Sequence, residues 1–292
     1  MPTFSTSSIP DMTGKTVIVT GANSGIGRAA ATALADHGAR LVLAVRNTDK
    51  GDAAASQMSG TTEVRRLDLA SLASVKEFAA AWNEPIDILI NNAGIMIPPL
   101  SRTADGFELQ FGINHLGHFL LTTLLLPELR AAAATTGNAR VVTVSSEAHR
   151  HWGIDLDDID FEQRGYDTFL AYGQAKSANI LMTVELQRRV GSDGITALAV
   201  HPGTCATNLG RYLDRATAKK LFAMSAETFA PENMKSVAQA AATTVWAATA
   251  PSLAGSGGAY LADCQIAQAA PAATDSATAR RLWLLSQEWV KR

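Results

Sequence analysis

Apolar runs rich in β-branched residues alternate with helix-like segments along most of the 292-residue chain, and no other feature restricts the fold as much. Strands that are apolar at every position are typical of a parallel sheet covered on both faces. The expected strands are residues 16–20, 41–45, 63–67, 86–90, 140–145, 195–200 and 259–261; the expected helices are 25–37, 48–58, 71–82, 105–130, 169–190 and 276–290. The pattern predicts an α/β fold with a doubly wound, mostly parallel sheet of about seven strands and helices on both faces.

A glycine-rich segment joins the first expected strand to the first expected helix. Its spacing, Gly21-x3-Gly25-x-Gly27, differs from the G-x-G-x-x-G of two-domain dehydrogenases. Glycines there allow a tight turn, and the helix N-terminus favours the negative charge of a pyrophosphate. An ordinary turn would carry the same glycines, but the position after a first strand favours a Rossmann-type dinucleotide site.

The end of the second expected strand indicates which dinucleotide binds. An acidic residue there usually accepts a hydrogen bond from the ribose 2′-hydroxyl of NAD. This chain instead has Arg46 and Asn47, and the first acid is Asp49. An arginine can pair with a 2′-phosphate, although a solvated surface arginine is the alternative. The sequence predicts NADP(H), with NAD(H) less favoured.

Neither a solenoid-length repeat nor a linker between two cores interrupts the pattern, so residues 1–292 are expected to form one dinucleotide-binding domain. Within it we expect an N-terminal extension (1–13), an irregular substrate-side segment (208–232) and a C-terminal helix (274–292).

Composition excludes several other classes of protein. A net charge of -2 gives no reason to expect a nucleic acid or an anionic membrane as partner. The most apolar stretch, residues 119–126, is far shorter than the ~20 residues of a membrane span. The first eleven residues are polar and unlike a signal peptide, so a cytoplasmic location is expected. Cys205 and Cys264 are expected to be unpaired thiols, although a bridge between them is the alternative.

A tyrosine and a lysine, Tyr172 and Lys176, are spaced to lie on one face of the expected helix 169–190. An ammonium group close to a phenol favours the phenolate, so we expect it to lower the tyrosine pKa towards neutrality. The phenol would then serve as an acid or a base near neutral pH. Alone, this spacing is most often a surface pair, and its weight comes from the other motifs.

These motifs together resemble the short-chain dehydrogenase/reductase family. The matching segments, in the family's order, are residues 20–27, Asp68-Leu69, residues 91–94, Asn114, Ser145-Ser146, residues 172–176, and residues 201–203 with Thr207. Residues 103–107, 114–121, 177–181, 260–264 and 281–283 are most similar to the retinol-dehydrogenase-like group, which includes WW-domain oxidoreductases, and to some bacterial ketoreductases.

The resemblance implies a role for each matched residue. Tyr172 exchanges a proton with the substrate oxygen, Lys176 holds the nicotinamide ribose and tunes Tyr172, Ser146 bonds the carbonyl, and Asn114 kinks its helix and anchors a water. With Arg46 added, the candidate cofactor-binding residues are Gly21, Asn23, Ser24, Gly25, Ile26, Gly27, Arg46, Asp68, Leu69, Asn92, Ala93, Gly94, Tyr172, Lys176, Pro202, Gly203, Thr204 and Thr207.

Two departures from the family pattern are visible. Ala175 stands where most relatives have a serine, which puts one supporting hydrogen bond in doubt. The segment between Ser146 and Tyr172 is longer than in the shortest members. Many retinol-dehydrogenase-like relatives also carry a membrane anchor, which this chain is expected to lack, so a retinoid substrate does not follow.

Other clusters give weaker signals. The acids at 155–160 lack the glycine and glutamate of a calcium loop, and two histidine pairs, at 115/118 and 149/151, lack a third ligand, so no metal is expected. His149 and His151 are expected at the surface, with substrate contact as the alternative.

Six side chains either wall the substrate cleft or belong to the core: Trp152, Phe161, Phe169, Tyr212, Phe222 and Met224. As cleft walls they would suit a bulky hydrophobic or aromatic carbonyl.

The leading hypothesis is an NADPH-dependent ketone or aldehyde reductase acting on a small-molecule carbonyl or alcohol. A non-catalytic NADP(H)-binding sensor or scaffold is the alternative from another class. A sugar-nucleotide epimerase or dehydratase is a third, disfavoured by the glycine spacing. We also expect a homo-oligomer formed through apolar faces of helices at 116–132 and 169–190.

Overall fold

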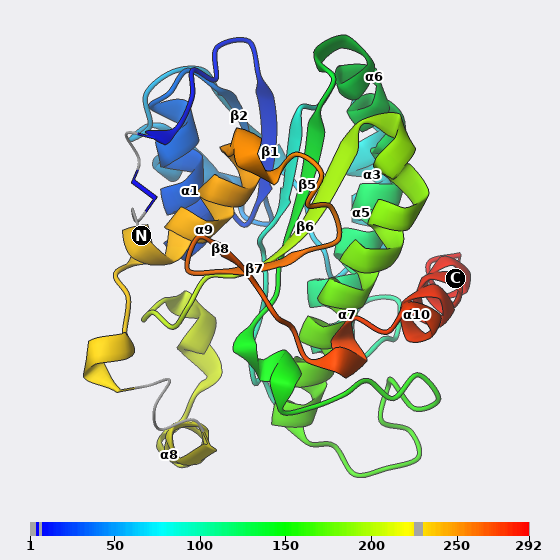
Figure 1. Ribbon diagram of the computed structural model, residues 1–292. Helices are drawn as coiled ribbons and strands as arrows, with labels where there is room; N and C mark the ends of the chain where they lie inside the picture. The colour runs from blue at the N-terminus through cyan, green and yellow to red at the C-terminus, as the bar shows by residue number, and fades with distance from the viewer. Residues whose placement is uncertain (1–3, 6–7, 225–229, 292) are drawn as a thin grey trace.

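The computed structural model describes residues 4–5, 8–224 and 230–291, and within them eight strands form one sheet in the order β3-β2-β1-β4-β5-β6-β7-β8 (Figure 1). The strands are β1 (Thr16–Thr20), β2 (Arg40–Val45), β3 (Thr62–Arg66), β4 (Ile88–Asn91), β5 (Ala139–Val144), β6 (Ile195–His201), β7 (Tyr260–Ala262) and β8 (Gln265–Ala267). All neighbouring pairs are parallel except β7 and β8. The predicted α/β fold is confirmed.

Helices cover both faces of this sheet, as predicted (Figure 1). They are α1 (Gly25–Ala35), α2 (Thr48–Ala55), α3 (Leu72–Ala80), α4 (Leu109–Phe111), α5 (Gly117–Leu124), α6 (Leu126–Thr136), α7 (Thr168–Val190), α8 (Arg215–Met224), α9 (Val237–Thr249) and α10 (Ser276–Trp289). Side chains of β1 alternate between the two layers: Val17 and Val19 lie in the core with α1 and α9, and Ile18 lies in the core with α3, α5 and α7. Burial on both faces explains why the strands are apolar throughout.

The sequence pattern missed the eighth strand. β8 has three residues and returns antiparallel to β7 through Asp263 and Cys264. Both turn residues have left-handed backbone angles, with φ of 51° and 55°. Because glycine or asparagine normally occupies such positions, Asp263 and Cys264 did not indicate a hairpin.

The expected long helix at 105–130 is divided into several pieces. Helical structure begins at α4, passes through a π-helical turn at Gly112–Leu116, and continues as α5 and then α6. The break between α5 and α6 lies at Leu125, two residues before Pro127, and a proline fits only near the start of a helix. The substrate-side segment at 208–232 contains a 3₁₀ turn (Asn208–Tyr212) and α8, and residues 225–229 lie outside the described residues.

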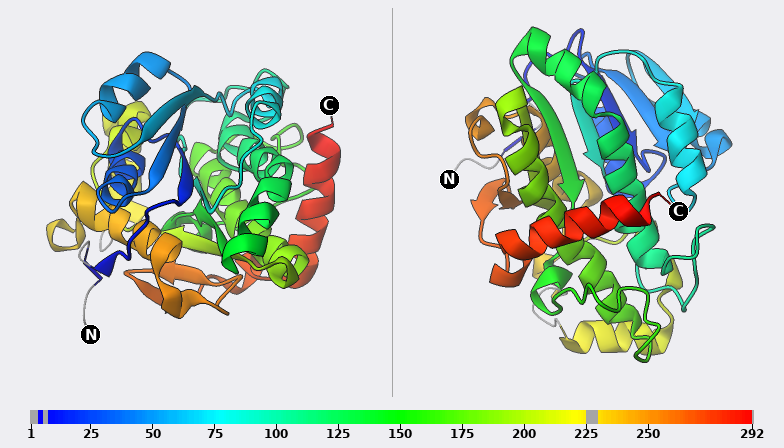
Figure 2. Two further views of the ribbon diagram at one scale, coloured as in Figure 1. Left: turned by 90° about the horizontal axis from the view of Figure 1, so that it is seen from above. Right: turned by 90° about the vertical axis from the view of Figure 1, so that its right-hand side faces the viewer.

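The C-terminal helix α10 crosses the outer side of α7 (Figure 2). Trp283 makes an edge-to-face contact with Phe119 at 4.9 Å between ring centroids, and Ser286 lies 3.0 Å from Nε2 of His115. The faces of α5 and α7 that we expected to join two subunits are therefore partly covered by the chain itself. The homo-oligomer stays a prediction, but an oligomer must use surface that α10 leaves open.

Candidate active site

The carboxyl ends of β1 to β6 lie at one edge of the sheet, because these strands are parallel. The segments that follow them contain the glycine-rich turn, Arg46, Asp68 and Leu69, residues 92–94, Ser146 and residues 202–207. The sheet order reverses between β1 and β4, which is where doubly wound proteins bind their ligands. The fold thus brings the predicted residues to one edge.

The turn after β1 and the loop after β4 interlock. Gly27 has no room for a side chain, because an added Cβ would lie 2.3 Å from Nδ2 of Asn92 and 2.8 Å from the carbonyl oxygen of Gly21. Oγ1 of Thr20 accepts hydrogen bonds from the backbone N–H groups of Asn92 and Ala93, each at 2.9 Å. Substituting Gly27 would separate the two loops.

The turn after β1 (residues 20–27) and the loop after β4 (residues 92–94) together form a cradle, and the N-terminus of α1 is open towards it. Ser24 occupies the N-cap position, but its side chain makes no capping hydrogen bond with any residue that the structure describes. Asp and Glu are both missing from the first turn of α1. Backbone N–H groups and the helix dipole therefore favour an anion here, and the cradle fits the pyrophosphate of a dinucleotide.

Arg46 follows β2 at the rim of the cradle. Its side chain is exposed and makes no ion pair within the described part of the chain. Asn47 beside it caps α2 by accepting a hydrogen bond from the backbone N–H of Lys50 at 2.9 Å. Arg46 thus remains available to a phosphate.

Helix α7 carries Tyr172 and Lys176, and its start is fixed by Asp167. The Asp167 carboxylate accepts hydrogen bonds from the backbone N–H groups of Phe169 and Leu170, at 2.8 and 3.1 Å. Both Tyr172 and Lys176 are buried. Nζ of Lys176 lies 5.7 Å from the centre of the Tyr172 ring, so the predicted pair shares one face of α7.

The expected lowering of the tyrosine pKa is wrong for this structure. Burial raises the pKa of Tyr172 to about 12, and a hydrogen bond with the Ser146 side chain offsets only part of that rise. Burial also lowers the pKa of Lys176 to about 8. The ammonium group bonds to a backbone carbonyl rather than to the phenol, so Tyr172 is a neutral phenol at physiological pH.

That backbone carbonyl belongs to Val144, the last residue of β5. Nζ of Lys176 and Nδ2 of Asn179 both donate to its oxygen, each at 3.0 Å. Oγ of Ser145 in turn donates to the carbonyl oxygen of Lys176 at 2.7 Å. Ser145 therefore ties α7 to β5, and Ser146 is the serine bonded to Tyr172.

Asn114 lies in the π-helical turn and holds the loop after β4. Its Nδ2 donates to the carbonyl oxygen of Ile95 at 3.0 Å, and its Oδ1 accepts from the backbone N–H of Ile95 at 2.9 Å. A Cβ added to Gly94 would lie 3.1 Å from that Oδ1 and 3.8 Å from Nζ of Lys176. Asn114 and Lys176 therefore face the same small space, and π-helical turns are frequent at functional sites.

Of the four histidines in the two predicted pairs, three are buried in the fold and one is exposed. Burial lowers the pKa of His115 to about 3 and that of His118 to about 4, so both are neutral near pH 7. His149 is buried, which corrects its expected surface position: Nε2 accepts from the backbone N–H of Ala270 at 3.0 Å. His151 is exposed. Among the described residues no group of three or more His, Cys, Asp or Glu could hold a metal ion.

The acidic stretch at 155–160 forms local contacts. Asp158 accepts from the backbone N–H groups of Glu162 and Gln163, and Asp160 accepts from that of Glu108. Of the six side chains predicted to wall the cleft, Phe161 and Phe169 are buried, Trp152 is half-buried, and Tyr212, Phe222 and Met224 are exposed. Cys205 and Cys264 are both free thiols.

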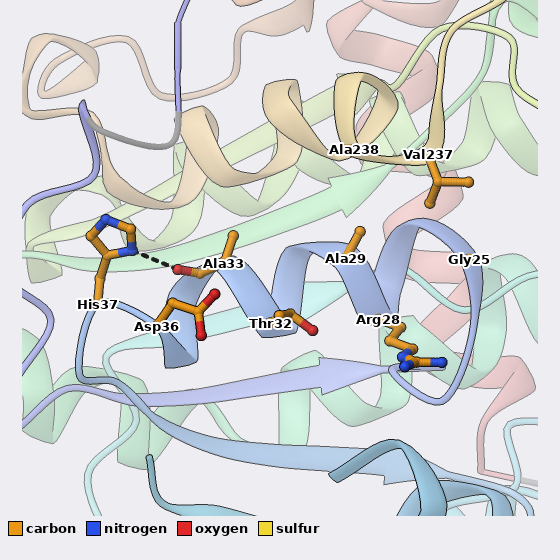
Figure 3. A pocket seen from close by; sticks show the side chains of 9 residues that line it. All are labelled: Gly25, Arg28, Ala29, Thr32, Ala33, Asp36, His37, Val237 and Ala238. Carbon is orange, nitrogen blue, oxygen red and sulfur yellow. Dashed lines mark hydrogen bonds between the residues drawn. The ribbon is translucent and has the colours of Figure 1, made fainter. Parts of the chain in front are cut away.

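A separate groove of about 540 Å³ lies between α1 and α9 (Figure 3). Its described lining is Gly25, Arg28, Ala29, Thr32, Ala33, Asp36, His37, Val237 and Ala238. Gly25 is the only one of these that was predicted to touch a cofactor. Because Tyr172, Lys176, Ser146 and Asn114 lie elsewhere, this groove is not the candidate active site.

Comparisons with known proteins show the family to which this chain belongs. A family model for short chain dehydrogenases matches residues 15–218. Human retinol dehydrogenase 13 is 45% identical over 288 residues, which cover 95% of this chain and 85% of that protein. The chain belongs to the short-chain dehydrogenase family. This short-chain dehydrogenase is an oxidoreductase of the retinol-dehydrogenase-like group, as its motifs indicated.

Two solved structures are also similar to this short-chain dehydrogenase. An uncharacterized protein from Mycobacterium paratuberculosis is 40% identical, with a TM-score of 0.80, and the match covers 99% of this chain and 98% of that one. The complex of Pseudomonas aeruginosa RhlG with NADP is 25% identical, with a TM-score of 0.69, covering 86% and 95%. No helix within the described residues is both long and apolar enough to cross a membrane.

Sequence reasoning missed two residues that support the site. Thr20 and Asn179 were both part of matched segments, but neither was assigned a role. Thr20 is fully buried between the loops after β1 and β4, and Asn179 shares the Val144 oxygen with Lys176. A polar residue one helical turn beyond Lys176 was the available signal for Asn179.

Proposed function

We propose that this short-chain dehydrogenase reduces a bulky hydrophobic or aromatic ketone or aldehyde with NADP(H). One observation carries the proposal: Tyr172 is a buried, neutral phenol bonded to Ser146, at the sheet edge that also holds the dinucleotide cradle. A neutral phenol is prepared to donate a proton, which is what reduction of a carbonyl requires.

The protein's own part in the reaction follows from this arrangement. A nicotinamide held at this site would supply the hydride for the carbonyl carbon. Oη of Tyr172 donates its proton to the developing alkoxide, and the Ser146 hydroxyl stabilises that oxygen by a hydrogen bond. Lys176 would hold the nicotinamide ribose, and Asn114, which fixes the loop at 94–95, would anchor a water for proton transfer.

The cofactor residues are those predicted from the sequence. Gly21, Asn23, Ser24, Gly25, Ile26 and Gly27 would surround the pyrophosphate, Asp68, Leu69, Asn92, Ala93 and Gly94 the adenosine, and Pro202, Gly203, Thr204 and Thr207 the nicotinamide end. Arg46 would pair with the 2′-phosphate, which supports NADP(H) over NAD(H). The NADP bound in the Pseudomonas structure is in keeping with this choice.

The substrate class rests on the apolar side chains beyond the carboxyl edge of the sheet, where α8 lies (Figure 1). Tyr212, Phe222 and Met224 are between 36% and 51% exposed, and apolar groups favour an apolar ligand over water. The similar human protein is named for retinol, a large apolar alcohol. The cytoplasmic location and the homo-oligomer stay predictions.

A substrate screen with both reduced cofactors tests the proposal. The carbonyl panel would contain aromatic ketones, polyketide-like ketones, retinals and steroids. We expect NADPH consumption with at least one class and none with Tyr172→Phe. Tight NADPH binding without turnover would contradict the proposal and favour the sensor or scaffold. NAD⁺ retained through purification would instead favour the epimerase.

A further inference from the structure

A lysine outside the catalytic set contacts the loop at 202–207 at several points. The backbone N–H of Lys235 donates to the carbonyl oxygen of Thr204 at 2.8 Å. Its Nζ donates to the carbonyl oxygen of Pro202 at 3.3 Å and forms an ion pair with the carboxylate of Asp263. One side chain thus joins the loop after β6 to the turn after β7.

The loop is shaped to receive this side chain. Gly203 has φ of 85°, and a Cβ added there would lie 2.6 Å from both Cε and Nζ of Lys235. The lysine therefore lies directly on the glycine backbone, with its side chain only 23% exposed. Any other residue at 203 would be strained in its backbone and would also displace the lysine.

The partner carboxylate is presented by a strained turn. Asp263 and Cys264 are consecutive non-glycine residues in the left-handed region, a conformation that is sterically unfavourable for residues with a Cβ. The turn is held by α9, because Oγ1 of Thr243 accepts from the backbone N–H of Cys264 at 3.2 Å. Strain of this kind persists where the surroundings impose it, and it concentrates at ligand clamps.

The loop that Lys235 contacts reaches the phosphate cradle at its other end. A Cβ added to Gly25 would lie 3.4 Å from Cγ2 of Thr207, so residue 207 packs against the start of α1. Thr207 also begins the 3₁₀ turn by accepting from the backbone N–H of Leu209 at 3.2 Å. A displacement of residues 202–204 would therefore be transmitted towards the pyrophosphate end.

We propose that Lys235 and Asp263 form a clamp that sets the position of the 202–207 loop and, through it, the nicotinamide half of the cofactor site. This inference rests on the proposed function for the identity of the ligand. Both are positioning residues, since their contacts are with the loop and with each other. The clamp predicts an effect on cofactor affinity rather than on the chemical step.

Hydrogen–deuterium exchange in the cofactor-free protein tests the clamp without any activity. In Lys235→Met and in Asp263→Asn, we expect the amides of residues 203–207 to exchange about three- to tenfold faster than in the wild type, because a charge-assisted contact is lost. Lys235→Arg, which retains the cation, should restore much of the protection. Glu288→Gln, which removes the exposed ion pair with Lys291, is the matched control and should leave the loop unchanged.

Steady-state kinetics provide the second readout. The KM for NADPH should rise about three- to tenfold in both variants while kcat stays within about twofold, as expected for lost ground-state binding. Unchanged exchange and unchanged KM in both variants would overturn the clamp, as would a fall in kcat with KM unaltered. Asp263 is 72% exposed, so Asp263→Asn is informative even if Lys235→Met fails to fold. If the wild type turns over no carbonyl, the proposed function fails and the exchange data still decide the clamp.

Discussion

Nζ of Lys176 lies 3.0 Å from the carbonyl oxygen of Val144 in a space where both residues are buried. The contact joins the centre of α7 to the end of β5. It also holds the ammonium group of Lys176 beside the other candidate catalytic residues. No carboxylate among the described residues pairs with this amine. Burying it therefore opposes folding, and its retention is explained by function.

Replacing this lysine should stabilise the protein. Because the folded-state pKa of Lys176 is lowered to about 8, the charge opposes folding below pH 8, and the penalty fades as the pH rises towards the unfolded value of 10.5. Lys176→Met should raise the free energy of unfolding by about 2–4 kcal/mol at pH 7. Asn179 continues to donate to the Val144 oxygen, so no carbonyl is orphaned.

Urea unfolding at pH 7 and above pH 10 measures this effect. The increase in the free energy of unfolding of Lys176→Met should be smaller at the higher pH. The control is Lys76→Met, at an exposed site on α3, which should change the free energy of unfolding by no more than about 0.5 kcal/mol. A destabilised Lys176→Met at pH 7 would show that the amine supports the fold.

The same pKa predicts a pH dependence of cofactor use. Lys176 is charged below pH 8 and neutral above it. Since kcat/KM for NADPH reports ionisations of the free enzyme, it should be level at neutral pH and fall about tenfold per pH unit above 8. Tyr172, with a pKa of about 12, should add no change between pH 6 and 10. A profile level to pH 10 would contradict the role of the ammonium group.

Cofactor preference should depend on Arg46. Arg46→Asp replaces a guanidinium with a carboxylate at the proposed 2′-phosphate site, and we expect the ratio of kcat/KM for NADPH to that for NADH to fall roughly 100-fold. Arg280→Asp, on the exposed side of α10, controls for net charge. An unchanged ratio in Arg46→Asp would remove this residue from the cofactor site.

The hydroxyl of Thr20 should be required for stability. Thr20→Val leaves the half-buried backbone N–H of Ala93 without its acceptor, while the N–H of Asn92 keeps the carbonyl oxygen of Ile90, so the free energy of unfolding should fall by about 1–3 kcal/mol. Thr20→Ser retains the hydroxyl and should lose much less. Equal losses in the two variants, measured by urea unfolding, would indicate that the methyl group matters instead.

Local spacing predicted the parts of the site that lie within one element. Tyr172 and Lys176 are one turn apart on a helix, so their shared face follows from helical geometry. The pKa values of Tyr172 and Lys176 could not be predicted from this spacing. They depend on the burial of Tyr172 and on the Val144 acceptor, and both of these follow from how α7 packs against β5. The hairpin at Asp263 and Cys264 was missed for a related reason: tertiary contacts impose a turn that these residues do not favour alone.

The central claim is that Tyr172 gives the proton, and single-turnover reduction at saturating NADPH tests it most directly. Tyr172→Phe removes only the hydroxyl and keeps the ring in its buried place. The account predicts a rate about 10²- to 10⁴-fold lower, with NADPH affinity within about twofold of the wild type. A Tyr172→Phe enzyme that reduces its substrate within about tenfold of the wild-type rate would contradict the account.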